Sequence, residues 1–256
     1  MPLADTGRGD GARPWALVTG GAIRLGRVFV EAAAANGYAV AVHAHSSLDA
    51  GRALVGELRQ RGHQAELVPA DLIDPMAPAK LVEDLAAAGR TPSLLVNSAA
   101  SFAHDRLSTA SADRFDAHMA LNLRAPLLLS RAFAAACPTS AGGLIVNVVD
   151  QRALQPSGEF LTYTLAKSAL LQLTRILAME LAPAIRVNAL APGIVMPERA
   201  MTDVRRQALV GRFPLGSGGD VDDLVAGFAY LLRARSVTGE VICVDGGAHL
   251  GRRDRP

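Results

Sequence analysis

The sequence contains very little lysine and very little cysteine. Lys80 and Lys167 are its only lysines, so 24 of the 26 basic residues among 256 are arginine. Its two cysteines, Cys137 and Cys243, suggest neither a disulfide framework nor the ligand spacing of a metal site. We therefore expect a protein of the reducing cytoplasm without a metal centre, and we treat each lysine as informative.

Long apolar runs and concentrated charge are also missing. No stretch approaches the ~18 consecutive apolar residues of a membrane span, and residues 1–11 lack the basic and apolar segments of a secretory signal. The net charge is only +2, with the arginines scattered along the chain. We expect no membrane partner and no nucleic-acid partner, and we expect residues 1–13 to be a disordered lead-in.

Short apolar segments alternate with segments whose apolar residues recur at a helical period. Strands are predicted at 15–18, 38–43, 65–68, 93–96, 144–149, 185–190 and 240–244. Helices are predicted at 25–36, 48–61, 75–88, 112–136, 160–181 and 221–233. Several strands are apolar throughout, which is typical of parallel strands covered on both faces. The pattern predicts a single doubly wound α/β domain over residues 14–250, followed by a tail at 251–256.

A glycine-rich turn follows the first predicted strand. Gly20, Gly21 and Gly26 would allow close approach of a pyrophosphate to a helix N-terminus. The spacing departs from G-x-G-x-x-G, so a turn that uses glycine only for its backbone conformation is the alternative. The position after the first strand of an alternating α/β chain favours a dinucleotide site.

The end of the second strand lacks the carboxylate that would bind a ribose 2′-hydroxyl. A 2′-phosphate would instead find cationic and hydroxyl donors there, from Arg24, His43, Ser46 and Ser47. We predict that NADP(H) is preferred over NAD(H). The alternative for His43 and His45 is that they are strand residues with no ligand role.

Polar residues also follow the third and fourth strands. Asp71 either binds the adenine amino group or caps the helix that begins near residue 75. Asn97 and Ala99 are placed to line the cofactor, unless Asn97 only forms a turn. Both positions lie where parallel sheets bind ligands.

Tyr163 and Lys167 lie one helical turn apart and share a face. An ammonium group near a phenol favours the phenolate and lowers its pKa, so the pair would transfer a proton as hydride arrives; a solvated surface pair is the alternative. Asp150 ends the fifth strand and either bonds the tyrosine, protonates a ring nitrogen, or forms a turn. Asn122 falls inside a predicted helix, where it would bind water or backbone near Lys167.

Together these residues resemble the short-chain dehydrogenase/reductase family from about residue 15 to residue 250. The matching features, in family order, are residues 19–26, Asp71, Asn97, Asn122, Tyr163 with Lys167, Pro192-Gly193 and Asp245-Gly246-Gly247. The resemblance implies a Rossmann-type sheet of seven parallel strands, an NAD(P)(H) cofactor, and a homotetramer or homodimer. The implied cofactor site comprises Gly20, Arg24, Leu25, His43, Ser46, Ser47, Asp71, Leu72, Asn97, Ala99, Tyr163, Lys167, Pro192, Gly193 and Ile194.

The pteridine reductase branch of that family is more similar still. Shared features are Arg24 in the glycine turn, His43 and His45, the turn at 97–102, Asp150 in place of the usual catalytic serine, and Gln155-Pro156. The resemblance implies that Phe102 stacks on a pterin held against the nicotinamide. It also implies that Asp150 and Tyr163 deliver protons, Lys167 holds the ribose, and Asn122 belongs to the catalytic set.

Some positions depart from that branch. Ser46 replaces a common arginine, Ala100 replaces a serine, and Val195 replaces a polar residue, so possible hydrogen bonds to cofactor or substrate are lost. Residues 194–214 would form a substrate lid. Its arginines, Arg199, Arg205, Arg206 and Arg212, either bind an acidic tail such as the glutamate of a folate or are solvated helix-face charges.

We therefore predict an NADPH-dependent reductase of a pterin-like or dihydropterin-like C=N bond. A carbonyl reductase or alcohol dehydrogenase of the same family, acting on an unknown small molecule, is the main alternative. A nucleotide-binding regulator without turnover is a third hypothesis. The presence of both Tyr163 and Lys167 argues against it.

Overall fold

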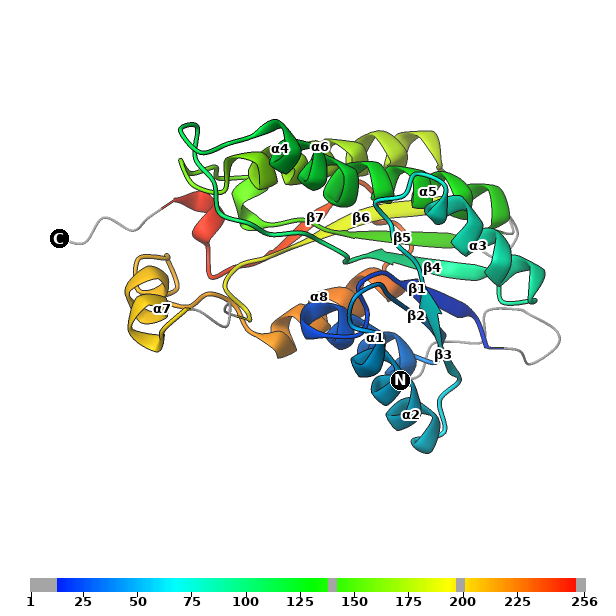
Figure 1. Cartoon of the computed structure of the whole chain (residues 1–256). Coiled ribbons are helices and arrows are strands. Elements are labelled where there is room, and N and C mark those ends of the chain that lie inside the picture. The colour runs from blue at the N-terminus through cyan, green and yellow to red at the C-terminus, as the bar shows by residue number, and fades with distance from the viewer. Residues whose placement is uncertain (1–12, 138–141, 197–200, 252–256) are drawn as a thin grey trace.

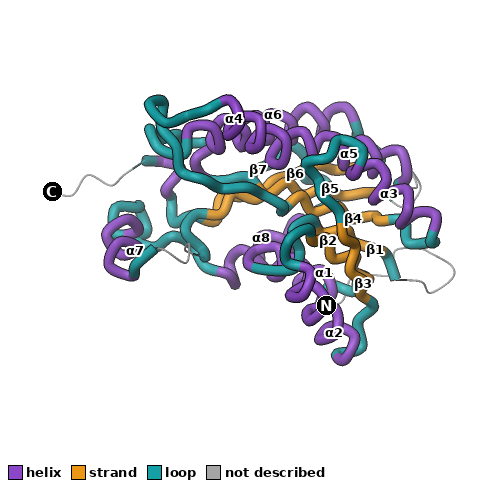
Figure 2. The backbone as a smooth tube through the Cα atoms, in the orientation of Figure 1, coloured by secondary structure: helices purple, strands orange, loops and turns teal. Residues whose placement is uncertain are grey.

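A seven-stranded parallel sheet forms the centre of the molecule (Figures 1 and 2). The computed structural model describes residues 13–137, 142–196 and 201–251, so most of the expected lead-in and tail lies outside the described residues. The strands are β1 (Trp15–Val18), β2 (Ala39–Ala44), β3 (Ala65–Pro69), β4 (Pro92–Asn97), β5 (Gly143–Val148), β6 (Ile185–Pro192) and β7 (Val241–Val244). Their order, β3-β2-β1-β4-β5-β6-β7, confirms the predicted doubly wound Rossmann-type fold.

Helices cover both faces of this sheet. They are α1 (Arg24–Ala35), α2 (Leu48–Gln60), α3 (Ala77–Ala87), α4 (Ala112–Met119), α5 (Ala125–Ala136), α6 (Leu161–Glu180), α7 (Asp203–Val210) and α8 (Val221–Arg233). Figure 1 shows α3, α4, α5 and α6 on one side of the sheet and α1, α2 and α8 on the other. No helix of the described residues is long and apolar enough to cross a membrane.

The alternation of side chains along the strands explains why both faces are covered. On β1, Ala16 and Val18 contribute to the core beneath α1, α2 and α8, whereas Leu17 contributes to the core beneath α3, α5 and α6. Phe29 and Phe228 fasten α1 to α8, with ring centroids 5.3 Å apart. Each of these fully buried rings stabilises the fold by up to about 3 kcal/mol.

Two helical features differ from the sequence prediction. The segment predicted as one helix over 112–136 is divided into α4, a π-helical turn at Ala120–Arg124, and α5. Pro126 follows that turn and has no backbone N–H to continue a regular ladder. The other difference is α7, which lies in the expected lid and is capped by the Thr202 hydroxyl accepting from the backbone N–H of Arg205.

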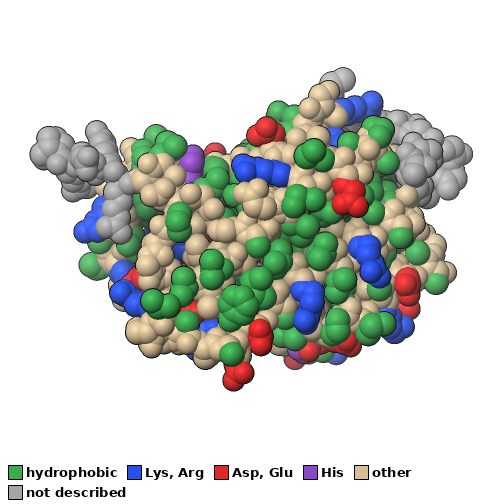
Figure 3. All heavy atoms as spheres, turned by 90° about the horizontal axis from the view of Figure 1, so that it is seen from above, with side chains coloured by type: hydrophobic (Ala, Val, Ile, Leu, Met, Phe, Trp, Pro, Cys, Tyr) green, Lys and Arg blue, Asp and Glu red, His purple; other side chains and the backbone are tan. Residues whose placement is uncertain are grey.

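The surface over α3 to α6 mixes hydrophobic side chains with scattered charges of both signs (Figure 3). Several large hydrophobic side chains on these helices are exposed, namely Phe115, Leu127, Leu165, Ile176 and Met179. The order of the strands predicts where a ligand binds. β2 and β4 flank β1 and connect to opposite faces, so a crevice is expected beyond the carboxyl ends of these strands.

Candidate active site

A cavity of about 590 Å³ lies at the carboxyl ends of the strands. Its lining brings together most of the predicted site residues, namely Gly20, Arg24, Leu25, His43, Ser46, Ser47, Asp71, Leu72, Ala99, Phe102, Asp150, Tyr163, Lys167, Pro192, Gly193 and Ile194. Asn97 and Asn122 are not part of that lining. Residues from the beginning, middle and end of the chain therefore converge where the doubly wound fold predicts a ligand.

The glycine turn is shaped by close backbone contacts. Gly20 has a φ of +61°, and a Cβ at this position would lie 2.9 Å from the Cα of Ala99. The Thr19 hydroxyl accepts the backbone N–H groups of Ser98 and Ala99, both at 3.0 Å, and so ties the turn to the end of β4. Ile23 at the N-cap of α1 makes no side-chain capping hydrogen bond, which leaves the helix N-terminus suited to an anion.

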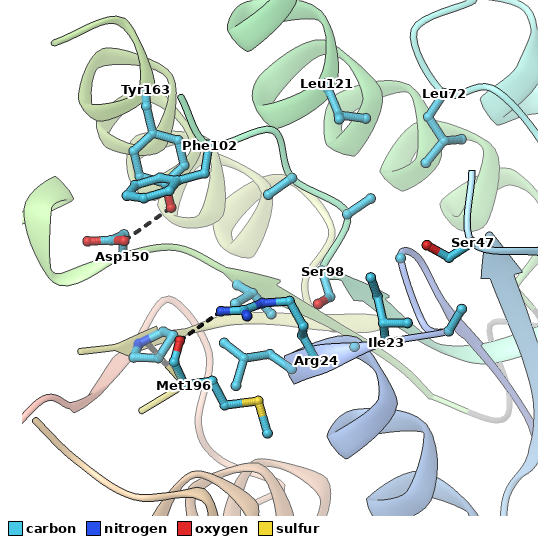
Figure 4. Close-up of a pocket in the computed structure, with 18 of the residues that line it drawn as sticks. Ile23, Arg24, Ser47, Leu72, Ser98, Phe102, Leu121, Asp150, Tyr163 and Met196 are labelled. Carbon is cyan, nitrogen blue, oxygen red and sulfur yellow. Dashed lines mark hydrogen bonds between the residues drawn. The ribbon is translucent and has the colours of Figure 1, made fainter. Parts of the chain in front are cut away.

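Arg24 crosses the cavity from this turn. Its Nη2 donates to the backbone oxygen of Met196 at 2.7 Å, as Figure 4 shows. The residue adopts a φ of +54°, which is unusual for a side chain other than glycine. The turn and the segment after β6 are thus linked across the mouth of the cavity.

His43 does not supply the positive charge that we predict from the sequence. Its Nδ1 accepts the Gly20 N–H at 3.1 Å, and its Nε2 lies 3.1 Å from the Ala70 oxygen, to which it donates in that tautomer. Burial lowers the pKa of His43 to about 4, so the ring is neutral at physiological pH. The predicted cationic character of His43 is therefore wrong, its contact with a 2′-phosphate stays a prediction, and its ring holds the glycine turn.

Hydroxyl groups remain at the end of β2. Ser46 and Ser47 both line the cavity, and Ser47 is the N-cap of α2 without a side-chain capping hydrogen bond. His45 lies 3.4 Å from Asp71, whose Oδ1 also accepts the N–H of Ile73 at 3.0 Å. Asp71 therefore closes its own turn and does not cap α3.

Asn97 is buried in the sheet. Its Nδ2 donates to the Oδ1 of Asn147 on β5 at 2.8 Å, and Asn147 in turn donates to the Thr174 hydroxyl on α6 at 2.9 Å. The turn-forming alternative is wrong, because Asn97 is the last residue of β4 and its side chain binds Asn147; its predicted contact with the cofactor stays a prediction. The residue fastens two neighbouring strands to the helix that carries Tyr163.

Asn122 lies in the π-helical turn and is fully buried. Its Oδ1 accepts the Ser101 N–H at 3.0 Å, and its Nδ2 donates to the Ser101 oxygen at 2.9 Å. The backbone that Asn122 binds thus belongs to the loop that carries Phe102. Its predicted catalytic contribution stays a prediction.

Tyr163 and Asp150 form the polar centre of the cavity. The Tyr163 hydroxyl donates to Asp150 Oδ2 at 3.1 Å (Figure 4), although α6 and the end of β5 supply the two residues. Burial, and then the negative charge of Asp150, raise the pKa of the Tyr163 phenol well above its ordinary value of 10.0. Tyr163 therefore keeps its proton at neutral pH and is available as a proton donor.

Lys167 lies deep beside this pair. Its Nζ donates to the Val148 oxygen at 2.6 Å and lies 5.9 Å from the centre of the Tyr163 ring. Burial lowers the pKa of Lys167 to about 8, whereas nearby Asp150 opposes that shift. The predicted lowering of the Tyr163 pKa by the ammonium is wrong for this structure, because burial of the phenol and Asp150 dominate.

Aromatic rings build the wall next to the Tyr163 hydroxyl. Phe102 stacks on Phe160 with centroids 4.3 Å apart, and it meets Tyr163 edge-on at 4.7 Å. Phe160, at the N-cap of α6, has a φ of +57°. Phe102 is 36% exposed, so this wall is open to a ligand.

Two groups near this wall were not anticipated from the sequence. Arg152 lines the cavity and pairs with Asp150, and the only available signal was its place two residues after that aspartate. Asp105 is fully buried and accepts the N–H and hydroxyl of Thr162, whose oxygen also lies 2.7 Å from His118 Nδ1. Asp105 thereby ties the Phe102 loop to the start of α6.

The lid prediction is only partly covered by the structure. Ile194, Met196 and Met201 line the cavity. The lid arginines within the described residues, Arg205, Arg206 and Arg212, do not line it, and Arg199 lies outside the described residues.

Of the departures from the pteridine reductases, Ala100 lines the cavity and Val195 is buried. Across residues 13–137, 142–196 and 201–251, no group of three or more His, Cys, Asp or Glu side chains is placed to hold a metal ion.

Known proteins match this chain over most of its length. Residues 21–249 match the family model described as enoyl-(acyl carrier protein) reductase. Pteridine reductase 1 of Leishmania tarentolae is 34% identical over 292 residues, covering 93% of this chain and 97% of its own. L-xylulose reductase of Bos taurus is 32% identical over 240 residues, covering 91% and 95%.

Solved structures agree with these sequence matches. The crystal structure of FolM alternative dihydrofolate reductase 1 from Brucella suis in complex with NADP superposes with a TM-score of 0.87. The two chains are 37% identical, and the match covers 95% of this chain and 97% of that chain. The level of identity makes the likeness one of sequence as well as of fold.

Proposed function

The chain belongs to the short-chain dehydrogenase/reductase family, in its pteridine reductase-like branch, and we propose that it reduces the C=N bond of a pterin-like or dihydropterin-like compound with NADPH. It is an NADP-dependent oxidoreductase. The observation that carries the finer proposal is the hydrogen bond between Tyr163 and Asp150 inside the cavity. A carboxyl group beside the catalytic phenol is useful when the reduced atom pair includes a ring nitrogen that must gain a proton.

The cavity fits the cofactor at its glycine-turn end. Gly20 and the uncapped N-terminus of α1 would receive the pyrophosphate, with Arg24 and Leu25 beside it. Ser46 and Ser47 would face the 2′-phosphate, where no carboxylate of the β2 end repels it. When bound, NADPH would supply the hydride.

The same fit extends along the rest of the cavity. Leu72 and Asp71 would flank the adenine, and Pro192, Gly193 and Ile194 would border the nicotinamide half together with Ala99. Lys167, a buried cation at neutral pH, would hold the ribose. These assignments follow the resemblance to the family and the presence of these residues in the lining.

The Tyr163–Asp150 pair would supply the proton. Tyr163 enters the reaction protonated, because its pKa is raised by burial and by Asp150. The substrate carbon gains the hydride, the adjacent nitrogen gains a proton from the pair, and the pair regains a proton from solvent. Lys167 lies close enough to stabilise the negative charge that remains at the pair before reprotonation.

The aromatic wall favours a planar substrate. Phe102 offers a partly exposed ring beside the Tyr163 hydroxyl, and a heterocycle stacked on it would present its edge to Asp150. The pteridine reductase of Leishmania tarentolae and the alternative dihydrofolate reductase of Brucella suis support this substrate class by their names.

A carbonyl reductase or alcohol dehydrogenase is the second candidate. Tyr163 and Lys167 suffice to protonate a carbonyl oxygen, and L-xylulose reductase of Bos taurus is among the relatives. The test is NADPH oxidation by the purified protein with biopterin, dihydrobiopterin, dihydromonapterin, dihydrofolate and a panel of ketones. Turnover of a pterin supports the proposal, whereas turnover of ketones without any pterin would overturn it in favour of the second candidate.

We also propose a homotetramer or homodimer in the cytoplasm. The exposed apolar side chains on α4, α5 and α6 support self-association, because an interface between copies of the chain would remove their apolar surface from water. Both cysteines are free, which fits a reducing compartment. Light scattering after size-exclusion chromatography and cell fractionation test these two statements; a monomer or a periplasmic pool would contradict them.

A further inference from the structure

Arg152 occupies an unusual position beside the reactive pair. It lies in the short 3-10 helix Gln151–Ala153 directly after β5, and its side chain is 23% exposed and lines the cavity. Its backbone N–H donates to Asp150 Oδ1 at 2.8 Å. Asp150 is therefore oriented by the backbone of residue 152, and the side chain of Arg152 is not needed for that purpose.

The guanidinium group has hydrogen-bonding capacity that the described protein atoms leave unused. A guanidinium carries five N–H donors. Among the described residues, its one hydrogen bond runs from Nη1 to Asp150 Oδ1 at 3.4 Å, close to the limit for such a bond. Most of its donors are thus left for a partner in the cavity.

Aromatic contacts hold the guanidinium in place. Its central carbon lies 4.8 Å from the centre of the Phe160 ring and 5.6 Å from that of Phe102. Because these two rings stack on each other, the cation rests beside a rigid surface. A planar cation held in this way loses little side-chain conformational entropy when it binds a planar acceptor.

The substrate ring and Arg152 would share this surface. Phe102 meets Tyr163 edge-on and lies near Arg152, and Phe160 covers one of its faces, so a substrate ring stacked on the other face would have Tyr163, Asp150 and Arg152 nearby. Asp150 would face the ring nitrogen that gains the proton. The substituent of the substrate ring next to that nitrogen would face the guanidinium group of Arg152.

We propose that Arg152 is a specificity-determining residue whose guanidinium donates to an oxo oxygen carried by the substrate ring next to the nitrogen that faces Asp150. The inference rests on the proposed function and narrows it to amino-oxo heterocycles. A simple ketone has no second oxygen at this place and gains nothing from Arg152. An amino group at the same ring position presents N–H donors to a cation, which is unfavourable.

The test is ligand binding to the NADP⁺-saturated protein, measured by isothermal titration calorimetry so that no turnover occurs. The probes are pterin, which carries the oxo group, and 2,4-diaminopteridine, which carries an amino group in its place. Arg152→Gln removes the charge but keeps the backbone N–H that orients Asp150. We expect it to weaken pterin binding by about 10- to 100-fold, the effect of losing a hydrogen bond to a charged group, and to leave the binding of 2,4-diaminopteridine unchanged or stronger.

Two further variants isolate the effect. Arg90→Gln is the matched control, because Arg90 also combines an ion pair, to Glu66, with a ring contact, to Trp15, but lies at the amino ends of the strands. It should bind both probes as the natural protein does. Arg152→Lys keeps a cation and should recover part of the preference for pterin, and it remains informative if the glutamine variant does not fold.

The outcomes separate this inference from the proposed function. Equal weakening of both probes in Arg152→Gln, or no change for either, would overturn the inference while leaving pterin reduction intact. If Arg152→Gln selectively loses pterin binding but the natural protein does not turn over any pterin with NADPH, the proposed role of Arg152 in binding is supported and the proposed reaction is refuted. Failure of the natural protein to bind pterin would overturn both.

Discussion

The two ends of the cavity are built in different ways. At the glycine-turn end, His43 is neutral and both of its ring nitrogens contact the backbone, while Gly20 is locked by close backbone packing. At the other end, Asp150, Lys167 and Tyr163 bring ionisable groups together in a buried place. Binding a phosphate requires N–H groups in fixed positions, which the glycine turn would provide. Transferring a proton requires ionisable groups, which Asp150, Tyr163 and Lys167 would provide.

The largest expected effect lies at the reactive end. Tyr163→Phe removes the proton donor and should lower kcat/KM by about 10³-fold, within the range for a general acid. NADPH binding, followed by fluorescence, should stay within about threefold of the natural protein. Tyr230→Phe, at an exposed position of α8, is the matched control and should keep full activity. Comparable activity of the Tyr163 variant would remove this residue from the chemistry.

The next effect lies at the cofactor end and depends on pH. The folded-state pKa of His43 is about 4, below the ordinary 6.5, so the unfolded state takes up the proton first as the pH falls. His43 should therefore cost about 3 kcal/mol of stability between pH 6.5 and pH 4. His43→Asn keeps an acceptor for Gly20 and should flatten this acid slope in urea denaturation. His63→Asn should leave the slope in place, and an unchanged slope in both variants would contradict the assignment.

Lys167→Met should separate activity from stability. Burial lowers the pKa of Lys167 to about 8, so the fold disfavours its charged form, and the penalty applies below that pH and is relieved as the pH rises towards 10.5. The variant should lose about 10²-fold in kcat/KM and gain about 2 kcal/mol at neutral pH, after allowing for the lost hydrogen bond to Val148. The exposed Lys80→Met serves as control for both measurements. A destabilised Lys167 variant at pH 7 would refute the burial penalty.

The smallest effect concerns the backbone of the glycine turn. Gly20→Ala places a Cβ 2.9 Å from the Ala99 Cα at a φ of +61°, and should cost about 1–2 kcal/mol together with a raised KM for NADPH. Gly56→Ala within α2 meets open space and should instead stabilise the protein slightly. Thermal denaturation of both variants measures the contrast. A Gly20 variant as stable as the natural protein would mean that the turn tolerates a side chain.

The sequence alone predicts the fold well because the fold depends on local periodicity. Largely apolar runs such as residues 144–149 favour strands buried on both faces, and their alternation with helices predicts a parallel sheet, whereas the order of the strands is seen only in the structure. The glycine turn and the Tyr163–Lys167 spacing are local patterns too, and both residues of the pair line the cavity. A motif that lies within a single helix, strand or turn can therefore be predicted from the sequence.

Contacts between distant elements were harder to predict. The stacking of Phe102 on Phe160 joins residues 58 positions apart, and the pairing of Asn97 with Asn147 joins two strands; no periodicity encodes either contact. The pKa of Tyr163 was predicted with the wrong sign, because a helical spacing shows that Lys167 is near but not how deeply the phenol is buried. Burial is a property of the assembled site.

Asp150 is the residue that most sharply distinguishes a substrate whose ring nitrogen gains a proton from a simple ketone. The most direct measurement is the ratio of kcat/KM for dihydrobiopterin to kcat/KM for a ketone that the protein reduces, compared between the natural protein and Asp150→Ser. We expect the ratio to fall by about 10²-fold or more in the variant, the effect of removing an acid–base group, with ketone reduction spared or improved. An unchanged ratio, or a selective loss of ketone reduction, would contradict it.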